Sequence, residues 1–109
     1  MYNNTVSEGK TIAIISYFHV IGLLIAFVMN QNKRNPFASF HIRQSVGLVL
    51  LSFLVNFLNR FSNFDWLSNL LWFGVFALWV IALIGAFQGQ EKRIPLLGDQ
   101  FQEWFKSIG

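Results

Sequence analysis

Charged residues are absent from three long stretches of this 109-residue chain, and this absence limits what the chain can fold into. No charge lies between Lys10 and Lys33. The apolar part of that interval, residues 11–29, would extend about 28 Å as a helix. The interval between Arg43 and Arg60 is also free of charge, and so are residues 66–90. A helix needs about 20 apolar residues to cross a bilayer, so each stretch is a candidate membrane span.

The composition supports this interpretation and excludes several other classes of protein. Hydrophobic residues make up 54% of the chain and charged residues 12%, so a soluble chain of this length could not bury its apolar surface. The same values exclude a disordered or nucleic-acid-binding tail. Cysteine is absent, which excludes a disulfide framework and any site built on a thiol. We therefore predict a small integral membrane protein that binds no nucleic acid.

We predict an all-α membrane protein that forms one domain over residues 1–109, with three transmembrane helices and a short C-terminal amphipathic interfacial helix. The predicted spans are residues 8–30, 40–60 and 66–89, and the predicted interfacial helix covers residues 99–108. Apolar residues of this last helix recur with helical spacing at Phe101, Trp104, Phe105 and Ile108. It is too short to cross a bilayer, so we expect it to lie in the membrane interface or to dock on a partner protein.

The positive charges predict an orientation for these three spans. The N-terminal segment and the second loop would share one side and carry two basic residues, whereas the first loop and the tail would carry six. Cytoplasmic loops carry the excess of Lys and Arg. We therefore predict a multi-pass protein of the bacterial inner membrane, with its N-terminus outside and its C-terminus in the cytoplasm.

Polar residues inside the apolar stretches fall on two helix faces. One face belongs to the second predicted span and the other to the first, because the members of each recur at helical spacing. Two interpretations are open: these side chains hydrogen-bond between helices, or they line a path through the membrane. The residues are Ser16, His19, Ser45, Ser52, Asn56 and Asn59.

Small residues predict where helices approach one another closely. Gly22 and Ala26 lie on the same face of the first predicted span as His19. Gly85 and Gly89 form a G-x-x-x-G motif in the third, which we expect to pack within the bundle or in self-association.

The sequence shows no constellation for catalysis. Asp65 is the one carboxylate between Lys10 and Gln90, and neither His19 nor His41 has a thiol or a second carboxylate nearby in the sequence. We therefore predict a protein that is not an enzyme, with no metal site and no cofactor.

Two short motifs resemble a known family. Phe40, His41 and Gln44 form an F-H-x-x-Q motif after a basic loop, and Pro95 and Gly98 belong to a second motif after the last span. Together they resemble a bacterial family of small membrane proteins of unknown function, grouped with the chloroplast inner-envelope protein-import component, the twenty-kilodalton Tic subunit. The resemblance covers residues 11–98. It implies a helical bundle and a role in protein translocation.

From these motifs we expect His41 and Gln44 to contact residues 92–98 and to fix the cytoplasmic end of the bundle. The expected function is that of an accessory subunit of a larger membrane complex, with protein translocation or insertion as the context. Two alternatives stay open: an oligomeric transporter or channel for small solutes or protons, with a Ser/Asn/His-lined path, and a lipid-interacting membrane organiser. The expected partners are membrane lipids and either a larger complex or further copies of this chain.

Overall fold

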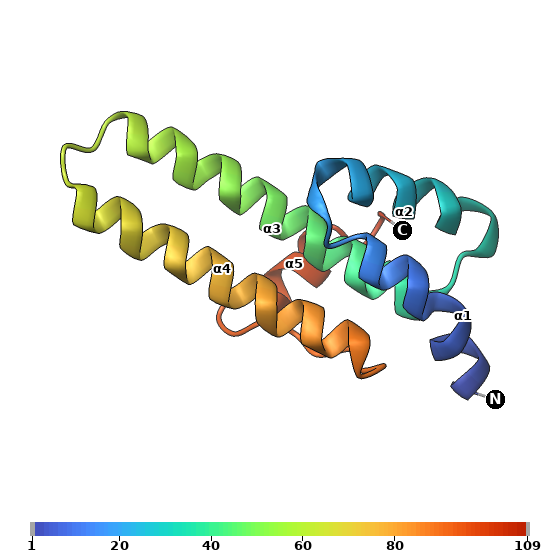
Figure 1. Ribbon diagram of the computed structural model, residues 1–109. Helices are drawn as coiled ribbons and strands as arrows, with labels where there is room; N and C mark the ends of the chain where they lie inside the picture. Colours follow the sequence, from blue (N-terminus) through green and yellow to red (C-terminus); the bar gives the residue numbers. More distant parts are fainter. Residues whose placement is uncertain (1, 109) are drawn as a thin grey trace.

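Five helices make up the part of the chain that the computed structural model describes, which is residues 2–108, with side chains from residue 6 onward. They are α1 (Tyr2–Ile15), α2 (His19–Lys33), α3 (Pro36–Arg60), α4 (Asp65–Phe87) and α5 (Gly98–Trp104). The long helices α3 and α4 form an antiparallel hairpin, and α1, α2 and α5 gather around the end of the hairpin that lies away from its loop (Figure 1). The described residues extend 52 × 23 × 22 Å.

Two helices of the described chain, α3 and α4, are long and apolar enough to cross a membrane, with mean hydropathies of 1.4 and 2.4. The all-α class is therefore confirmed, but the prediction of three spans is wrong. The first predicted span, residues 8–30, is divided into α1 and α2, neither of which has the required length.

The division lies at residues 16–18, where the chain leaves the α-helical hydrogen-bonding pattern. The Ser16 hydroxyl donates to the Ala13 carbonyl at 2.6 Å. The amides of Tyr17 and Phe18 then donate to carbonyls three residues back, which is the 3₁₀ pattern. His19 then adopts a left-handed backbone conformation, with φ of 61°, and begins α2. The chain therefore reverses, and α2 contacts α1.

Gly22 allows the two short helices to approach closely at this reversal. A Cβ atom at this position would overlap with the carbonyl oxygen of Ile15, the last residue of α1. Gly22 and Ala26, which the sequence predicts to form a packing face, are both buried. At the reversal they face α1, which the predicted span of residues 8–30 would have made part of the same helix.

The junction between α2 and α3 is held by its own polar side chains. Arg34 ends α2 in a left-handed conformation, with φ of 47°, and Pro36 occupies the first turn of α3. The Asn35 side chain accepts from the Ala38 amide at 3.1 Å and so caps α3. For these reasons α3 begins four residues before the predicted span of 40–60, whereas α4 differs from the predicted 66–89 by no more than two residues at either end.

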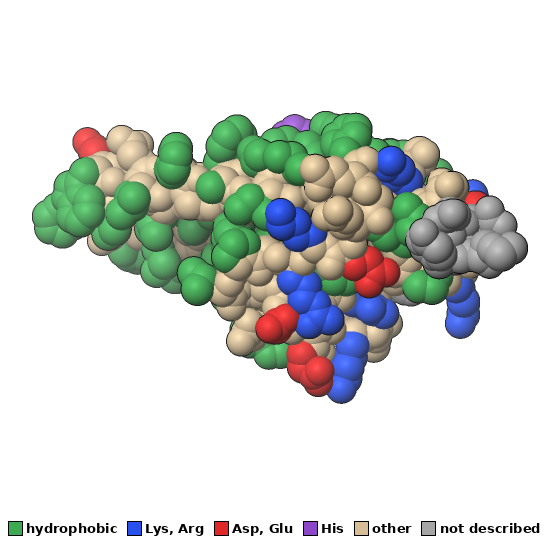
Figure 2. Space-filling view, turned by 90° about the horizontal axis from the view of Figure 1, so that it is seen from below, with side chains coloured by type: hydrophobic (Ala, Val, Ile, Leu, Met, Phe, Trp, Pro, Cys, Tyr) green, Lys and Arg blue, Asp and Glu red, His purple; other side chains and the backbone are tan. Residues whose placement is uncertain are grey.

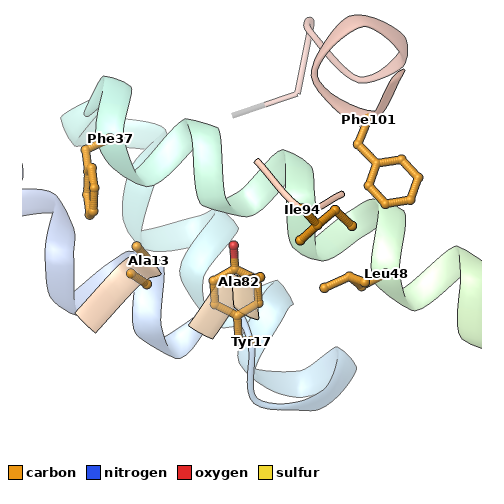
Figure 3. Packing of buried hydrophobic residues seen from close by; sticks show 8 residues of the cluster. Ala13, Tyr17, Phe37, Leu48, Ala82, Ile94 and Phe101 are labelled. Atoms are coloured by element: carbon orange, nitrogen blue, oxygen red, sulfur yellow. The ribbon is translucent and has the colours of Figure 1, made fainter. Parts of the chain in front are cut away.

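The C-terminal helix α5 docks on α3. Phe101 lies directly against Gly47, where a Cβ atom would overlap with the aromatic ring. The Gln102 amide donates to the Phe40 carbonyl at 2.9 Å. Phe101, Ile94 of the α4–α5 connection and Leu48 of α3 belong to one buried cluster (Figure 3).

This docking corrects the prediction of an interfacial helix over residues 99–108. The helix is shorter, and its apolar stripe is divided between the protein core and the surface. Phe101 is buried, Phe105 and Ile108 are partly buried, and Trp104 is 64% exposed. The tail therefore packs first on its own chain and leaves Trp104 for the surroundings.

Four segments meet at one end of the molecule, which we call the base. They are the start of α1, the α2–α3 junction, the end of α4 and the α5 tail. Gly9 abuts Asn35, Gly89 abuts Val6, and the Arg43 guanidinium donates to the Ile108 carbonyl at 2.9 Å. The α3–α4 loop, residues 61–64, forms the opposite end, which we call the tip. The chain therefore has its two described ends together, unlike the predicted three-span path.

A labelling experiment tests this arrangement. Because the chain has no cysteine, Ser7→Cys, Ser107→Cys and Asn63→Cys each supply a single exposed thiol. We expect a membrane-impermeant maleimide to modify the base positions 7 and 107 from the same side of the membrane and the tip position 63 from the other. Modification of positions 7 and 107 from opposite sides would contradict the fold.

A second experiment tests the docking of α5. Gly47→Ala should destabilise the protein by about 1–3 kcal/mol, because the added methyl group overlaps with Phe101. The matched control is Gly74→Ala, since nothing lies within 4 Å of a Cβ atom there. We expect the thermal unfolding midpoint in detergent to fall for position 47 only, with faster tryptic removal of the tail. Equal midpoints for the two variants would exclude the contact.

Candidate functional site: a buried polar cluster at the base

Three buried polar side chains meet at the base, and we call them the Tyr-His-Gln cluster: Tyr17, His41 and Gln44. His41 and Gln44 lie one turn apart on α3, so their side chains emerge from the same face of that helix. Tyr17 comes from the break between α1 and α2, which places its side chain against α3. The break in the first predicted span is therefore also what supplies the third member of the cluster.

The hydrogen bonds assign every proton of the cluster. His41 Nε2 lies 2.9 Å from the Gln90 carbonyl oxygen, which only accepts, so this nitrogen carries the proton. His41 Nδ1 then accepts from the Tyr17 hydroxyl, at 2.5 Å. The Tyr17 oxygen in turn accepts from the Gln44 amide nitrogen, at 3.1 Å. The result is a directed chain of hydrogen bonds through neutral side chains.

Gln44 uses both ends of its amide to hold the connection between α4 and α5. Its nitrogen also donates to the Lys92 carbonyl at 3.2 Å, and its oxygen accepts from the Ile94 amide at 2.9 Å. The predicted contact of Gln44 with residues 92–98 is thus present. His41 contacts Gln90, two residues before that segment.

The surroundings of the cluster are aromatic and buried. Phe37 and Phe40 approach His41 edge to face, with ring centroids at 4.8 and 5.0 Å, and Tyr17 does so at 5.5 Å. Burial raises the pKa of Tyr17 above its ordinary value, and the hydrogen bond from Gln44 offsets this only in part. The phenol therefore remains a donor at neutral pH.

Glycines let the connection lie this close to the helices. A Cβ atom at Gly85 would come within 3.1 Å of the Lys92 side chain and 3.9 Å of the His41 ring, so the predicted packing face of Gly85 is used within the chain. Gly89 has φ of 70° and turns the chain after α4, which is a different role from the helix packing predicted for it. Gly98 abuts Arg93, and Pro95 is exposed.

A second polar cluster at the α2–α3 junction was missed by sequence analysis. The Asn30 side chain accepts from the Asn35 amide at 2.9 Å and donates to the Ser39 hydroxyl at 2.9 Å. All three residues are buried. The signal that points to this cluster is a pair of asparagines flanking the Arg34 turn, because Asn readily bonds to nearby backbone.

The predicted intramembrane polar residues do not gather on one path. Ser45 donates to the Ser16 carbonyl, Ser52 donates to the Leu48 carbonyl of its own helix, and Asn56 is exposed. The buried oxygen of Asn59 has no hydrogen-bond partner among the described residues.

Three of them, His19, Ser45 and Ser52, nevertheless line the same open groove between the α1–α2 turn, α3 and α4. The groove has a volume of about 430 Å³ and is otherwise largely apolar, with Trp72, Phe76 and Trp79 among its lining residues. Within the described part of the chain, no hydrogen bond joins His19 to α3.

The Tyr-His-Gln cluster has a structural role: it holds the α4–α5 connection against α3, and we call this set of hydrogen bonds the fastening. The hydrogen bonds of its three side chains all go to another member of the cluster or to the backbone of Gln90, Lys92 and Ile94. No group of three or more His, Cys, Asp or Glu side chains that could hold a metal ion occurs among the described residues.

Comparison with known proteins supports membrane association. The chain is 28% identical over 97 residues to a UPF0132 membrane protein of Methanocaldococcus jannaschii, and the similarity covers 84% of this chain and 83% of that protein. No protein-family model matches the chain, and no solved structure matches it. The name of the archaeal relative carries no link to the chloroplast import component.

Removal of the Gln44 amide tests the fastening. Gln44→Leu leaves the Ile94 amide and the Lys92 carbonyl without their partner, so we expect a loss of about 2–4 kcal/mol in unfolding free energy. The matched control is Ser52→Ala on the same helix, which loses a bond within α3 and should change stability by less than about 0.5 kcal/mol. The measurement is the unfolding midpoint in detergent. A Gln44→Leu midpoint equal to that of the control would refute the interpretation.

Proposed function

We propose that this chain is an integral membrane protein that works as a small subunit of a larger membrane assembly, formed with other proteins or with further copies of itself. The observation that carries the proposal is a pair of asparagines near the tip, one of them exposed and the other with a side-chain oxygen that has no hydrogen-bond partner among the described residues. Asn56 is exposed between Phe53 and Phe57, which are both more than half exposed, and Asn59 has a buried, unpaired side-chain oxygen. Amides on an apolar hairpin are stabilised by a neighbouring helix that bonds to them.

The distribution of burial supports the same proposal. In the most apolar part of α4 only 17% of the residues are buried by the rest of the chain, whereas the corresponding share in α3 is 56%. The exposed apolar side chains cover the hairpin from its middle to the tip, and they include Leu50, Phe53, Leu54, Phe57, Phe73 and Phe76. Such a surface accommodates both lipid and a neighbouring transmembrane helix, and the asparagines favour a helix on the α3 side.

We also propose an orientation, with the base in the cytoplasm. Of eight Lys and Arg residues, seven belong to the base and Arg60 alone lies at the tip. Charged side chains gather on one part of the surface in Figure 2, while the hairpin is covered by hydrophobic ones. Under the positive-inside rule this asymmetry supports a cytoplasmic location for both described ends of the chain. In this arrangement α1 and α2 form a hairpin that enters the cytoplasmic leaflet without crossing it.

Protein translocation or insertion is the context that we propose for the assembly, and its support is the resemblance of the two motifs. Both motifs lie at the base, where His41 and Gln44 hold the connection that precedes Pro95 and Gly98. The alternative of an oligomeric transporter has less support. Of the six residues predicted to line a path, only His19, Ser45 and Ser52 line one groove. Ser45 already donates a hydrogen bond to the Ser16 carbonyl.

Site-specific photocrosslinking tests the proposal. Phe53 on the hairpin and Leu24 on α2 are equally exposed, at 59%, so a photoreactive amino acid at these positions samples two matched surfaces. At native expression level we expect a discrete protein adduct from position 53 and only lipid adducts from position 24. Asn56→Leu should abolish the adduct without lowering the unfolding midpoint. Lipid adducts alone from position 53 would overturn the proposal.

A further inference from the structure

A polar groove of about 410 Å³ lies at the base, between the start of α3, the α4–α5 connection and α5. We call it the arginine groove, because three of its lining residues are Arg34, Arg43 and Arg93. Ser39, Glu91 and Gln102 supply further polar side chains. With Glu91 as its one acidic lining residue, the groove has three positive charges against one negative charge.

The three guanidinium groups keep donors available for a ligand. Arg43 uses its Nε to bond the Ile108 carbonyl, which fixes the side chain, and its terminal nitrogens form no ion pair with the described residues. Arg34 forms no ion pair within the described part of the chain. Arg93 pairs with Asp99 at 2.6 Å, but the two side chains are 53% and 77% exposed, so the pair is weak and can be exchanged for a ligand.

The backbone and a buried hydroxyl add to this preference for anions. The groove includes Pro36 in the first turn of α3, where the helix carries partial positive charge. The buried Ser39 oxygen accepts from Asn30, which leaves the Ser39 hydroxyl hydrogen to be donated. The groove therefore combines guanidinium forks, a helix N-terminus and a hydroxyl donor, which is a donor set suited to phosphate.

The position of the groove along α3 indicates where that phosphate comes from. Arg43 precedes Arg60 at the tip by 17 residues, or about 26 Å of helix, and the hydrocarbon core of a bilayer is about 30 Å thick. A hairpin whose tip lies at one surface therefore holds the arginines at the headgroup level of the other. Leu96 and Trp104 belong to the adjoining connection and α5, and their side chains are 91% and 64% exposed, which is typical of contact with an interface.

We propose that the arginine groove binds the phosphate of an anionic phospholipid in the leaflet at the base. This site goes beyond the proposed subunit function, since it requires no partner chain and is formed by residues distant from the hairpin surface that carries Asn56. Lipid binding there would fasten the α4–α5 connection, which the Tyr-His-Gln cluster holds from its other side.

The test uses the full chain in detergent, with phosphatidylglycerol and phosphatidylcholine as paired probes in native mass spectrometry and in thermal unfolding. We expect phosphatidylglycerol to bind about tenfold more tightly and to raise the unfolding midpoint, and Arg34→Gln and Arg93→Gln each to weaken its binding by about tenfold. The matched control, Arg60→Gln, removes the same charge at the tip and should leave binding unchanged. Each variant without lipid should unfold at the parent midpoint.

Three results would overturn the assignment. Equal binding of the two phospholipids would exclude recognition of negative charge. Equal weakening by Arg60→Gln would show attraction by net charge alone. Inorganic phosphate that binds as tightly as phosphatidylglycerol would assign the groove to a soluble phosphate ligand and exclude the lipid. Arg34→Lys keeps the charge but not the bidentate geometry, so it should weaken phosphatidylglycerol binding less than Arg34→Gln does.

Discussion

The amide of Gln44 is the interaction on which the rest of this structure depends. It joins α3 to two other segments of the chain: the α1–α2 break, through the Tyr17 hydroxyl, and the α4–α5 connection, through the Lys92 carbonyl and the Ile94 amide. Buried backbone outside a helix is stable only where other groups satisfy its hydrogen bonds. The α4–α5 connection meets this condition through Gln44 and His41, so the tail can lie against the helices and bring Phe101 onto Gly47.

This fastening divides the molecule into two parts with different physical character. At the base, small residues, buried amides and aromatic rings bring five helices into close contact. Toward the tip, α3 and α4 have only each other, and their outer surfaces carry large apolar side chains. The base is complete within one chain, whereas the apolar hairpin requires lipid or a second protein. This combination fits the proposed role of a small subunit, because a tightly packed base would hold the hairpin in one orientation.

The sequence predicted the parts of the fold that depend on hydrophobicity and local spacing. Gaps in charge located α3 and α4, and the two motifs predicted the contact of Gln44 with the segment after α4, whereas His41 contacts Gln90 just before that segment. Hydropathy could not reveal the break at residues 16–18, because no Gly or Pro marks it and both short helices are apolar. Tyr17 was missed for a related reason: its partners lie 24 and 27 residues away, and only the reversal brings them together.

The break also changes how the basic residues are distributed between the two ends of the molecule. With three spans, Lys10 would lie across the membrane from Lys33 and Arg34, and the basic residues would oppose one another in part. Because α1 and α2 form a hairpin, all three lie at the base, and Arg60 is the one basic residue at the tip. The same reversal ends with Arg34 in a left-handed conformation at the mouth of the arginine groove. The proposed orientation and the proposed anion site therefore both depend on the turn at residues 16–18, which returns the chain to the base.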